Sequence, residues 1–238
     1  MISFIVPAYN EEALIGGTLE TLNRAAQTLG EAYEIVVADD ASSDGTANIA
    51  EAHGARVVRV ERRQIAATRN AGAREALGDK LIFVDADTRV NEAVVRAASD
   101  AMNRGAAGGG SGVNFDGKLP RYAERVHPAM IRIFRALGLA CGCFLFCTRS
   151  AFNAAGGFDE KLFASKEITM SRALKRQGRF VVLRETVTTS GRKLRMYSGK
   201  DVLRLFASIL LAGPKALRSR DALEVWYGGR REDPDLAG

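Results

Sequence analysis

The sequence predicts an α/β protein with a doubly wound, mostly parallel central sheet. In its first half, short apolar runs alternate with helical patterns four times over. The runs ISFIV, EIVV and LIFV are continuous rather than alternating, which is typical of parallel strands buried on both faces. The 238 residues, 47% of them apolar, can bury a large core.

The first half contains four predicted strand–helix pairs. The strands are expected at 2–7, 33–39, 55–60 and 80–87, and the helices at 10–30, 42–54, 64–78 and 91–105. The first helix has Asn10 as its expected cap, and the second has Ser42, Ser43 or Asp44. Glycines 30, 54 and 78 end the first three helices.

The second half is less regular, and no linker divides it from the first. Strands are expected at 105–115, 139–150 and 179–191, and helices at 122–138, 164–178, 198–213 and 222–229. We therefore expect one domain over 1–190, with a first half at 1–104 and a second at 105–190. A basic helical extension over 191–238 is expected to pack on it.

Positive charge is concentrated near the C-terminus. The chain carries +6 overall, but residues 190–231 alone hold ten Lys/Arg and three Asp/Glu. This predicts an anionic partner, either a phosphate-bearing ligand or a membrane surface. Nucleic acid is not expected, because aromatic residues do not interleave with the basic ones. The segment 200–220 is apolar on a broad face and fits either a buried core helix or a helix resting on an anionic bilayer. The core helix is favoured, because the alternative exposes the apolar face.

The chain is expected to be cytoplasmic. Its N-terminus lacks the pattern of a signal peptide, and no run of 18 apolar residues occurs. Cys141, Cys143 and Cys147 are an odd, clustered set, so a disulfide framework is not indicated. We expect them to be reduced and buried on a strand.

Acidic residues follow the predicted strands where these leave the core. Asp39 and Asp40 end the second strand, and Asp85 and Asp87 end the fourth. In open α/β sheets ligands bind at the carboxyl ends of the strands. No G-x-G-x-x-G turn or P-loop lysine is present, so a divalent cation bridging phosphate to carboxylate is the favoured alternative. Asp87 could instead cap the following helix.

Five motifs in register resemble the family 2 glycosyltransferases, which are inverting enzymes with the GT-A fold. The motifs are VPAYNEE at the N-terminus, VVADDASSDGT at 36–46, ATRNAGAREA at 67–76, VDAD at 84–87 and AAGGFDEKLF at 154–163, with Glu167 shortly after. The resemblance covers residues 2 to 187. It implies a single GT-A-like domain and a nucleotide-sugar donor, with a uridine diphosphate sugar favoured.

The resemblance implies roles for residues on the donor side. The nucleotide is expected to contact Pro7, Ala8, Tyr9, Glu11, Asp39, Asp40 and Arg69. In the VDAD motif it implies that Asp85 lies on the ribose side and that Asp87 binds Mn²⁺ or Mg²⁺, with Ala86 between them and Asp85 as a second metal contact.

The resemblance implies that Glu167 is the general base, which takes the proton of an acceptor hydroxyl on a carbohydrate or lipid-linked molecule. Here the sequence departs from the family, because Lys166 stands where an acid usually precedes the base. The helix dipole offers another reason for an acid at Glu167.

Two other functions share this layout. A nucleotide-sugar-binding or partner-binding module without transfer activity would fit the altered Lys166. A sugar-phosphate nucleotidyltransferase would need a glycine-rich basic loop after the first strand, which is absent. His53 is expected at an exposed helix end, and His127 is expected to be exposed or capping. Trp226 and Tyr227 are expected to pack the last helix.

Overall fold

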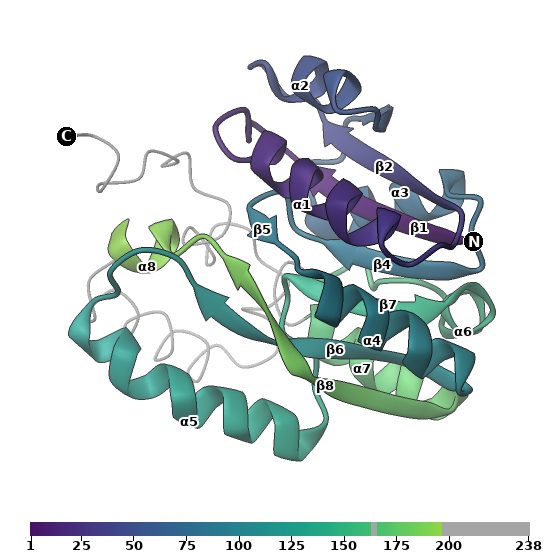
Figure 1. Ribbon diagram of the computed structural model, residues 1–238, viewed down its shortest axis with the longest axis vertical. Coiled ribbons are helices and arrows are strands. Elements are labelled where there is room, and N and C mark those ends of the chain that lie inside the picture. The colour runs from purple at the N-terminus through teal and green to yellow at the C-terminus, as the bar shows by residue number, and fades with distance from the viewer. Residues whose placement is uncertain (163–165, 197–238) are drawn as a thin grey trace.

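A computed structural model describes residues 1–162 and 166–196 of the chain as one curled sheet with helices on both faces (Figure 1). The strands are β1 (Ile2–Ala8), β2 (Tyr33–Asp40), β3 (Arg56–Val60), β4 (Lys80–Val84), β5 (Thr88–Arg89), β6 (Ala106–Phe115), β7 (Phe144–Thr148) and β8 (Arg179–Thr189). The helices are α1 (Ile15–Gln27), α2 (Thr46–Ala52), α3 (Ile65–Glu75), α4 (Glu92–Asn103), α5 (Arg121–Leu137), α6 (Arg149–Ala155), α7 (Lys166–Gln177) and α8 (Arg192–Met196).

The strand order is β3-β2-β1-β4-β7-β6-β8-β5. The four strands β3, β2, β1 and β4 are parallel to one another, as expected for the repeated strand–helix pairs. β7 runs antiparallel to both β4 and β6, while β8 is parallel to β6. The sheet is therefore mixed but mostly parallel, and the predicted fold class is confirmed.

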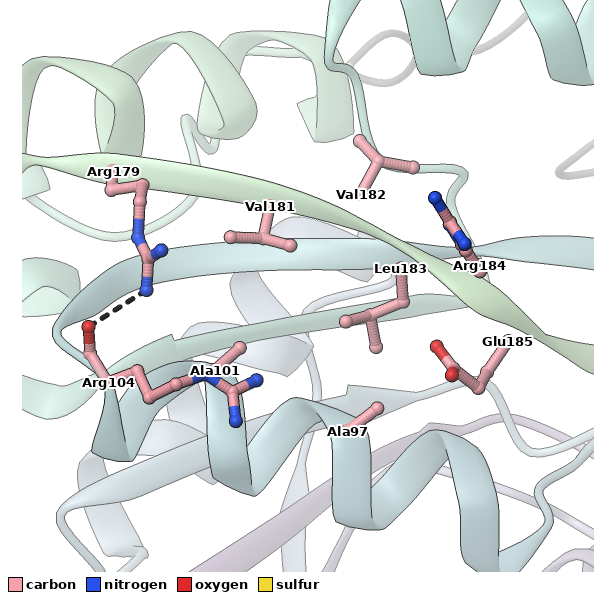
Figure 2. A pocket seen from close by; sticks show the side chains of 9 residues that line it. All are labelled: Ala97, Ala101, Arg104, Arg179, Val181, Val182, Leu183, Arg184 and Glu185. Carbon is pink, nitrogen blue, oxygen red and sulfur yellow. Dashed lines mark hydrogen bonds between the residues drawn. The ribbon is translucent and has the colours of Figure 1, made fainter.

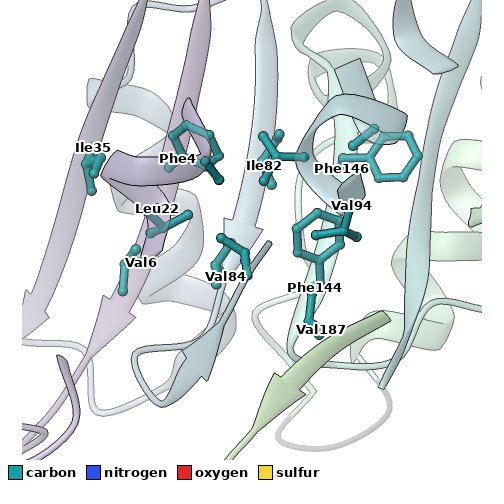
Figure 3. Packing of buried hydrophobic residues seen from close by; sticks show 14 of the residues in the cluster. Phe4, Val6, Leu22, Ile35, Ile82, Val84, Val94, Phe144, Phe146 and Val187 are labelled. Carbon is teal, nitrogen blue, oxygen red and sulfur yellow. The ribbon is translucent and has the colours of Figure 1, made fainter. Parts of the chain in front are cut away.

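Each face of the sheet carries its own apolar core. One core packs α1 and α4 on the sheet through side chains such as Leu22 and Val94, against Phe4, Ile82 and Phe144 (Figure 3). The other core lies under α3, α6 and α7. Helices on both faces explain why the central strands are apolar throughout, because neither side of them meets water.

The first helix starts later than expected. α1 begins at Ile15, and Asn10 adopts a positive φ of 51° instead of capping it. The Asn10 Oδ1 accepts from the Ser43 backbone N–H at 2.8 Å, and the Asn10 N–H donates to Ser42 Oγ at 2.9 Å. The cap prediction was wrong because these polar groups join the end of β1 to the loop after β2.

Two predicted strands were too long. β4 ends at Val84, and Asp85–Asp87 form a turn in which the Thr88 N–H donates to the Asp85 carbonyl at 3.0 Å. β7 begins only at Phe144, so Cys141 and Cys143 precede it. All three cysteines are free, as predicted, and Cys143 and Cys147 are buried while Cys141 is half-buried. Short elements β5, α6 and α8 were not predicted.

The two histidines differ from each other. His53 ends α2 at the surface, as expected. His127 is half-buried, where an exposed or capping position was expected: its Nε2 lies 2.8 Å from the Val113 carbonyl oxygen, and its ring packs edge-on against Phe115. It joins α5 to β6 and contacts no acid there.

Part of the predicted C-terminal extension falls outside the described residues, as do Trp226 and Tyr227. Within the part of the chain that the structure describes, no helix is both long enough and apolar enough to cross a bilayer.

Candidate active site at the strand ends

The carboxyl ends of β1, β2 and β4 lie at one edge of the sheet, next to α7 and α8. Parallel pairing sets Ala8 beside Asp39, and β4 ends directly before Asp85. The described structure therefore brings the sequence-predicted residues to one region. Their side-chain contacts divide them into an Arg69 group, an Arg192 group and a cavity beside β2.

Arg69 is the centre of the first group. It lies on α3, only 2% exposed, and its Nη2 is 2.6 Å from Asp85 Oδ1 while its Nη1 is 2.8 Å from Glu167 Oε1. Nη2 also donates to the Gly142 carbonyl at 2.7 Å. The guanidinium lies 5.2 Å from the centre of the Phe158 ring. One cation therefore links the acid after β4 to the acid in the first turn of α7.

Glu167 is held in its ionised form. Burial opposes its charge, but Lys166 and Arg69 outweigh burial and lower the pKa of Glu167 to about 2. Lys166 Nζ lies 3.6 Å from Glu167 Oε1, and burial lowers the pKa of the Lys166 ammonium. Burial raises the pKa of Asp85 despite the nearby Arg69. Asp85 and Glu167 thus contact the same guanidinium but differ in proton affinity.

Asp87 belongs to a second group centred on Arg192. Arg192 Nη2 donates to both carboxylate oxygens of Glu11 at 2.6 Å and lies 3.3 Å from Asp87 Oδ2. The hydroxyl of Thr189 donates to Asp87 Oδ1 at 3.2 Å. Asp85 and Asp87 therefore have separate arginine partners in this structure. Asp87 does not cap α4, because Asn91 does so through its Oδ1.

Asp39 and Asp40 have different surroundings. The Asp40 carboxylate accepts from the backbone N–H groups of Arg62, Arg63 and Gln64, at 2.6, 2.9 and 3.2 Å, and from the Thr68 hydroxyl at 2.9 Å. It therefore fastens the loop that leads into α3. Asp39 instead lines a cavity of about 480 Å³ whose walls come from the loop after β2, from α2 and from the end of β3.

Tyr9 lies beside this region with a cation over its ring. The Arg63 guanidinium is 4.3 Å from the ring centre, a distance at which a cation and an aromatic face attract. Arg63 itself has a positive φ of 50°, which is uncommon for a residue with a side chain. One face of the Tyr9 ring, an expected nucleotide contact, is therefore covered by an arginine. The backbone of Pro7 and Ala8 belongs to β1.

The residues fit a divalent cation that is coordinated partly by the protein and partly by a bound substrate. Among residues 1–162 and 166–196, no cluster of three or more His, Cys, Asp and Glu forms an all-protein cage. Asp85 and Asp87 offer two carboxylates, which is the usual protein share when phosphates and water supply the rest. In this structure Asp87 shares the Arg192 guanidinium with Glu11, which lies closer to it.

Sequence reasoning missed three contacts of this site: Arg192, Thr189 and Arg63. Arg192 contacts Glu11 across 181 positions of sequence, so no local pattern connects the two. The only signal was a basic residue shortly after the last apolar strand.

A second cavity, of about 330 Å³, lies between α4 and β8 (Figure 2). Its lining combines apolar side chains with three arginines and one acid, namely Arg104, Arg179, Arg184 and Glu185. The Arg179 Nη2 donates to the Arg104 carbonyl at 2.8 Å. None of the predicted site residues lines this cavity.

Solved structures share this fold. A mannosyltransferase of Pyrobaculum calidifontis, PcManGT, in complex with GDP-Man and Mn²⁺, superposes with a TM-score of 0.65 at 18% identity, covering 98% of this chain and 66% of that one. Residues 1–349 of S. aureus TarS in complex with UDP-GlcNAc give a TM-score of 0.62 at 20% identity, covering 79% and 58%. The architecture is therefore that of the GT-A glycosyltransferases.

Curated relatives match over a shorter stretch. A Bacillus subtilis protein described as an uncharacterized glycosyltransferase, YfnE, is 40% identical over 90 residues, covering 36% of this chain and 22% of that protein. An undecaprenyl-phosphate 4-deoxy-4-formamido-L-arabinose transferase of Shewanella sediminis is 38% identical over 93 residues, covering 36% and 28%. The matched stretch thus spans about a quarter of these relatives.

The glycosyl transferase family 2 pattern matches residues 3–158. This range contains β1 to β7, the acids after β2 and β4, and Arg69. It ends just before the segment that leads to Glu167. With the fold and the strand-end acids in agreement, the chain belongs to glycosyl transferase family 2.

Proposed function

We propose that the protein is an inverting, divalent-metal-dependent glycosyltransferase that moves a hexosyl-type sugar from a nucleoside diphosphate to an acceptor hydroxyl. The observation that carries this proposal is the Arg69 guanidinium, which lies within 2.8 Å of both Asp85 and Glu167. It ties the donor-side acid after β4 to the acid in the first turn of α7. Displacement with inversion needs a base on the side of the sugar opposite the leaving diphosphate, and Glu167 would supply that base.

On the donor side, Asp39 would accept a hydrogen bond from the base or ribose in the cavity beside β2. Tyr9 would offer its ring to the base, and Arg63 would have to move if the base takes the covered face. Asp85 would contact the ribose side, while Glu11 and Arg192 border the same region. Asp40 would act indirectly, by holding the loop that carries Arg63.

Asp87, with Asp85, would hold Mn²⁺ or Mg²⁺. When bound, such an ion would neutralise charge that develops on the departing diphosphate. UDP is the favoured nucleotide, as the family resemblance implies. The UDP-GlcNAc complex of TarS supports UDP, and the GDP-Man complex of PcManGT makes GDP the alternative.

In the transfer step, the acceptor oxygen would bond to the anomeric carbon while the bond from that carbon to the diphosphate oxygen breaks. The acceptor proton would pass to the Glu167 carboxylate. With a pKa of about 2, this carboxylate is ionised at neutral pH but is a weak base. Substrate binding would have to weaken its contacts with Arg69 and Lys166, which would raise its proton affinity.

The acceptor would be a carbohydrate or a lipid-linked molecule, and the undecaprenyl-phosphate transferase relative supports the second class. We further propose a cytoplasmic location, with the basic C-terminal segment contacting an anionic membrane. This part rests on the sequence of the segment alone.

A second candidate is a nucleotide-sugar-binding module without transfer. It is favoured by the strong pairing of Glu167 with Lys166 and Arg69, which lowers its basicity.

Two measurements separate the transferase from the binding module. The first is a thermal-shift screen of nucleotide sugars with and without Mn²⁺, and the second is an assay of nucleoside diphosphate release. A donor that binds raises Tm by mass action. For the enzyme, Asp87→Ala should abolish metal-dependent release, whereas Asp79→Ala, an exposed acid before β4, should not. Glu167→Gln should keep donor binding and lose transfer. Tight donor binding without transfer to any of a broad panel of acceptors would favour the binding module.

A further inference from the structure

Helix α5 exposes an apolar stripe that the described structure leaves uncovered. Val126, Met130, Ile133 and Leu137 are 59, 37, 55 and 58% exposed. Their spacing of four, three and four residues puts them on one face of the helix. Figure 1 shows α5 running along the outer edge of the molecule, beside β6 and β8. Large apolar side chains gathered in this way mark an interaction surface more often than isolated ones do.

The helix packs on the domain through a different side. Ala123 is its only buried residue, and His127, Ile131 and Phe134 are half-buried. These four recur at helical spacing and form a face next to the stripe. The contact between His127 and the Val113 carbonyl fixes that face against β6. The stripe is therefore not needed to hold α5 in place.

Three arginines border the stripe on its other side. Arg121, Arg125 and Arg132 are exposed and follow one another at spacings of four and seven, which makes a second row along the helix. Within residues 1–162 and 166–196, none of the three has an ion pair or a side-chain hydrogen bond. Glu124 is the only acid on the helix. The long arginine stems can lie along an apolar surface while their charged ends reach an anionic one.

We propose that α5 docks on an anionic membrane surface. The apolar stripe enters the boundary between headgroups and acyl chains, and the arginine row contacts the anionic headgroups. A helix with an apolar face and a bordering row of unpaired basic side chains has the chemistry of an interfacial membrane helix. The partner is thus identified by charge as well as by apolar character.

Charge also argues against two other occupants. The apolar stretch 202–212 of this chain contains Arg204 and no acid, so it offers the arginine row no opposite charge. A second copy packed through α5 would bring two arginine rows together, which is unfavourable.

The inference deepens the acceptor part of the proposed function, because a lipid-linked acceptor would be presented at such a surface. Its test needs neither donor nor metal. Failure would leave transfer to a carbohydrate acceptor untouched.

The experiment is co-sedimentation of the full chain with vesicles of phosphatidylcholine, with and without phosphatidylglycerol. The protein should sediment with the anionic vesicles, and less so as salt is raised. The double variant Val126→Ser/Ile133→Ser should lower the partition coefficient by roughly tenfold or more, because two apolar side chains no longer insert. The matched control Leu77→Ser removes a 73% exposed apolar side chain elsewhere and should bind as the wild type does.

The arginine row has its own test. Arg125→Gln/Arg132→Gln should weaken the preference for phosphatidylglycerol, whereas Arg74→Gln, an exposed arginine on α3, should leave it unchanged. Thermal unfolding of each variant checks that it is folded.

The proposal is overturned if the wild type stays in the supernatant with anionic vesicles. It is equally overturned if the stripe variant sediments normally, because another segment then carries the contact. Dimers in sedimentation analysis that the stripe variant abolishes, without vesicle binding, would assign the stripe to a second copy.

Discussion

Replacing Arg69 by methionine tests whether the two acids around it depend on its charge. Arg69 is fully surrounded, and its guanidinium pairs with Asp85 at 2.6 Å and Glu167 at 2.8 Å. Removing one partner of a buried ion pair leaves an uncompensated charge and typically costs about 3–5 kcal/mol. The lowering of the Glu167 pKa from 4.5 to about 2 corresponds to about 3 kcal/mol, of which Lys166 contributes a share.

The loss should depend on pH in a defined direction. In the wild type the folded-state pKa of Glu167 is depressed, so its stabilisation is fully present above about pH 4.5 and is lost as pH falls toward 2. In Arg69→Met the pKa of Glu167 should rise, so its protonation at mildly acid pH relieves the buried charge. The difference in unfolding free energy from the wild type should therefore be larger at pH 7.5 than at pH 4.5.

Urea unfolding at the two pH values measures both effects. The control Arg74→Gln changes an exposed arginine on the same helix and should alter stability by less than about 0.5 kcal/mol. A second measurement, on Arg69→Met/Glu167→Gln, should recover part of the loss because one stranded charge is removed. An equal loss at both pH values would refute the electrostatic reasoning and leave only packing.

Two further predictions concern stability and donor binding. Asp40→Ala should lower the free energy of unfolding in urea by about 2–4 kcal/mol, because three backbone N–H groups and a hydroxyl lose their acceptor. Asp39→Ala should cost less stability but weaken donor binding measured by calorimetry. The reverse ranking would contradict a structural role for Asp40 and a donor-binding role for Asp39. Gly109→Ala should lower Tm strongly, because a Cβ there would clash with the Val181 carbonyl oxygen of the neighbouring strand. Gly17→Ala, whose Cβ would meet no atom closer than 3.5 Å, should be neutral or stabilising; equal effects of the two changes would refute the packing argument.

The sequence alone was sufficient for the layout of the first half. Continuous apolar runs such as LIFV specify strands covered on both faces, and helical spacing between them forces parallel crossovers. The position of the acids at the strand ends could also be predicted, because Asp39 and Asp85 come directly after buried apolar runs. These patterns involve residues that are close in sequence, so they can be recognised without knowing the fold. The five motifs added the family, which the match to residues 3–158 confirms.

The start of α1 and the end of β4 could not be predicted in the same way. Asn10 looks like a helix cap, but its side chain instead accepts from the loop after β2, 33 residues away. Asp85 and Asp87 look like a continuation of the strand, but the Thr88 N–H donates to the Asp85 carbonyl and the chain turns. For Asn10 a distant partner took the polar group that the local pattern had assigned to the helix, and for Asp85 a local turn replaced the pleat.

The sequence by itself determined which residue types stand at the strand ends, because burial dictates where an apolar run must stop. Only the tertiary structure decided which of them share a partner. Arg69 pairs with Asp85 and also with Glu167, which lies 98 positions away, and Arg192 pairs with Asp87 and also with Glu11, which lies 181 positions away. Such pairs form because a buried guanidinium must find carboxylates wherever the fold brings them, and sequence spacing carries no record of that distance.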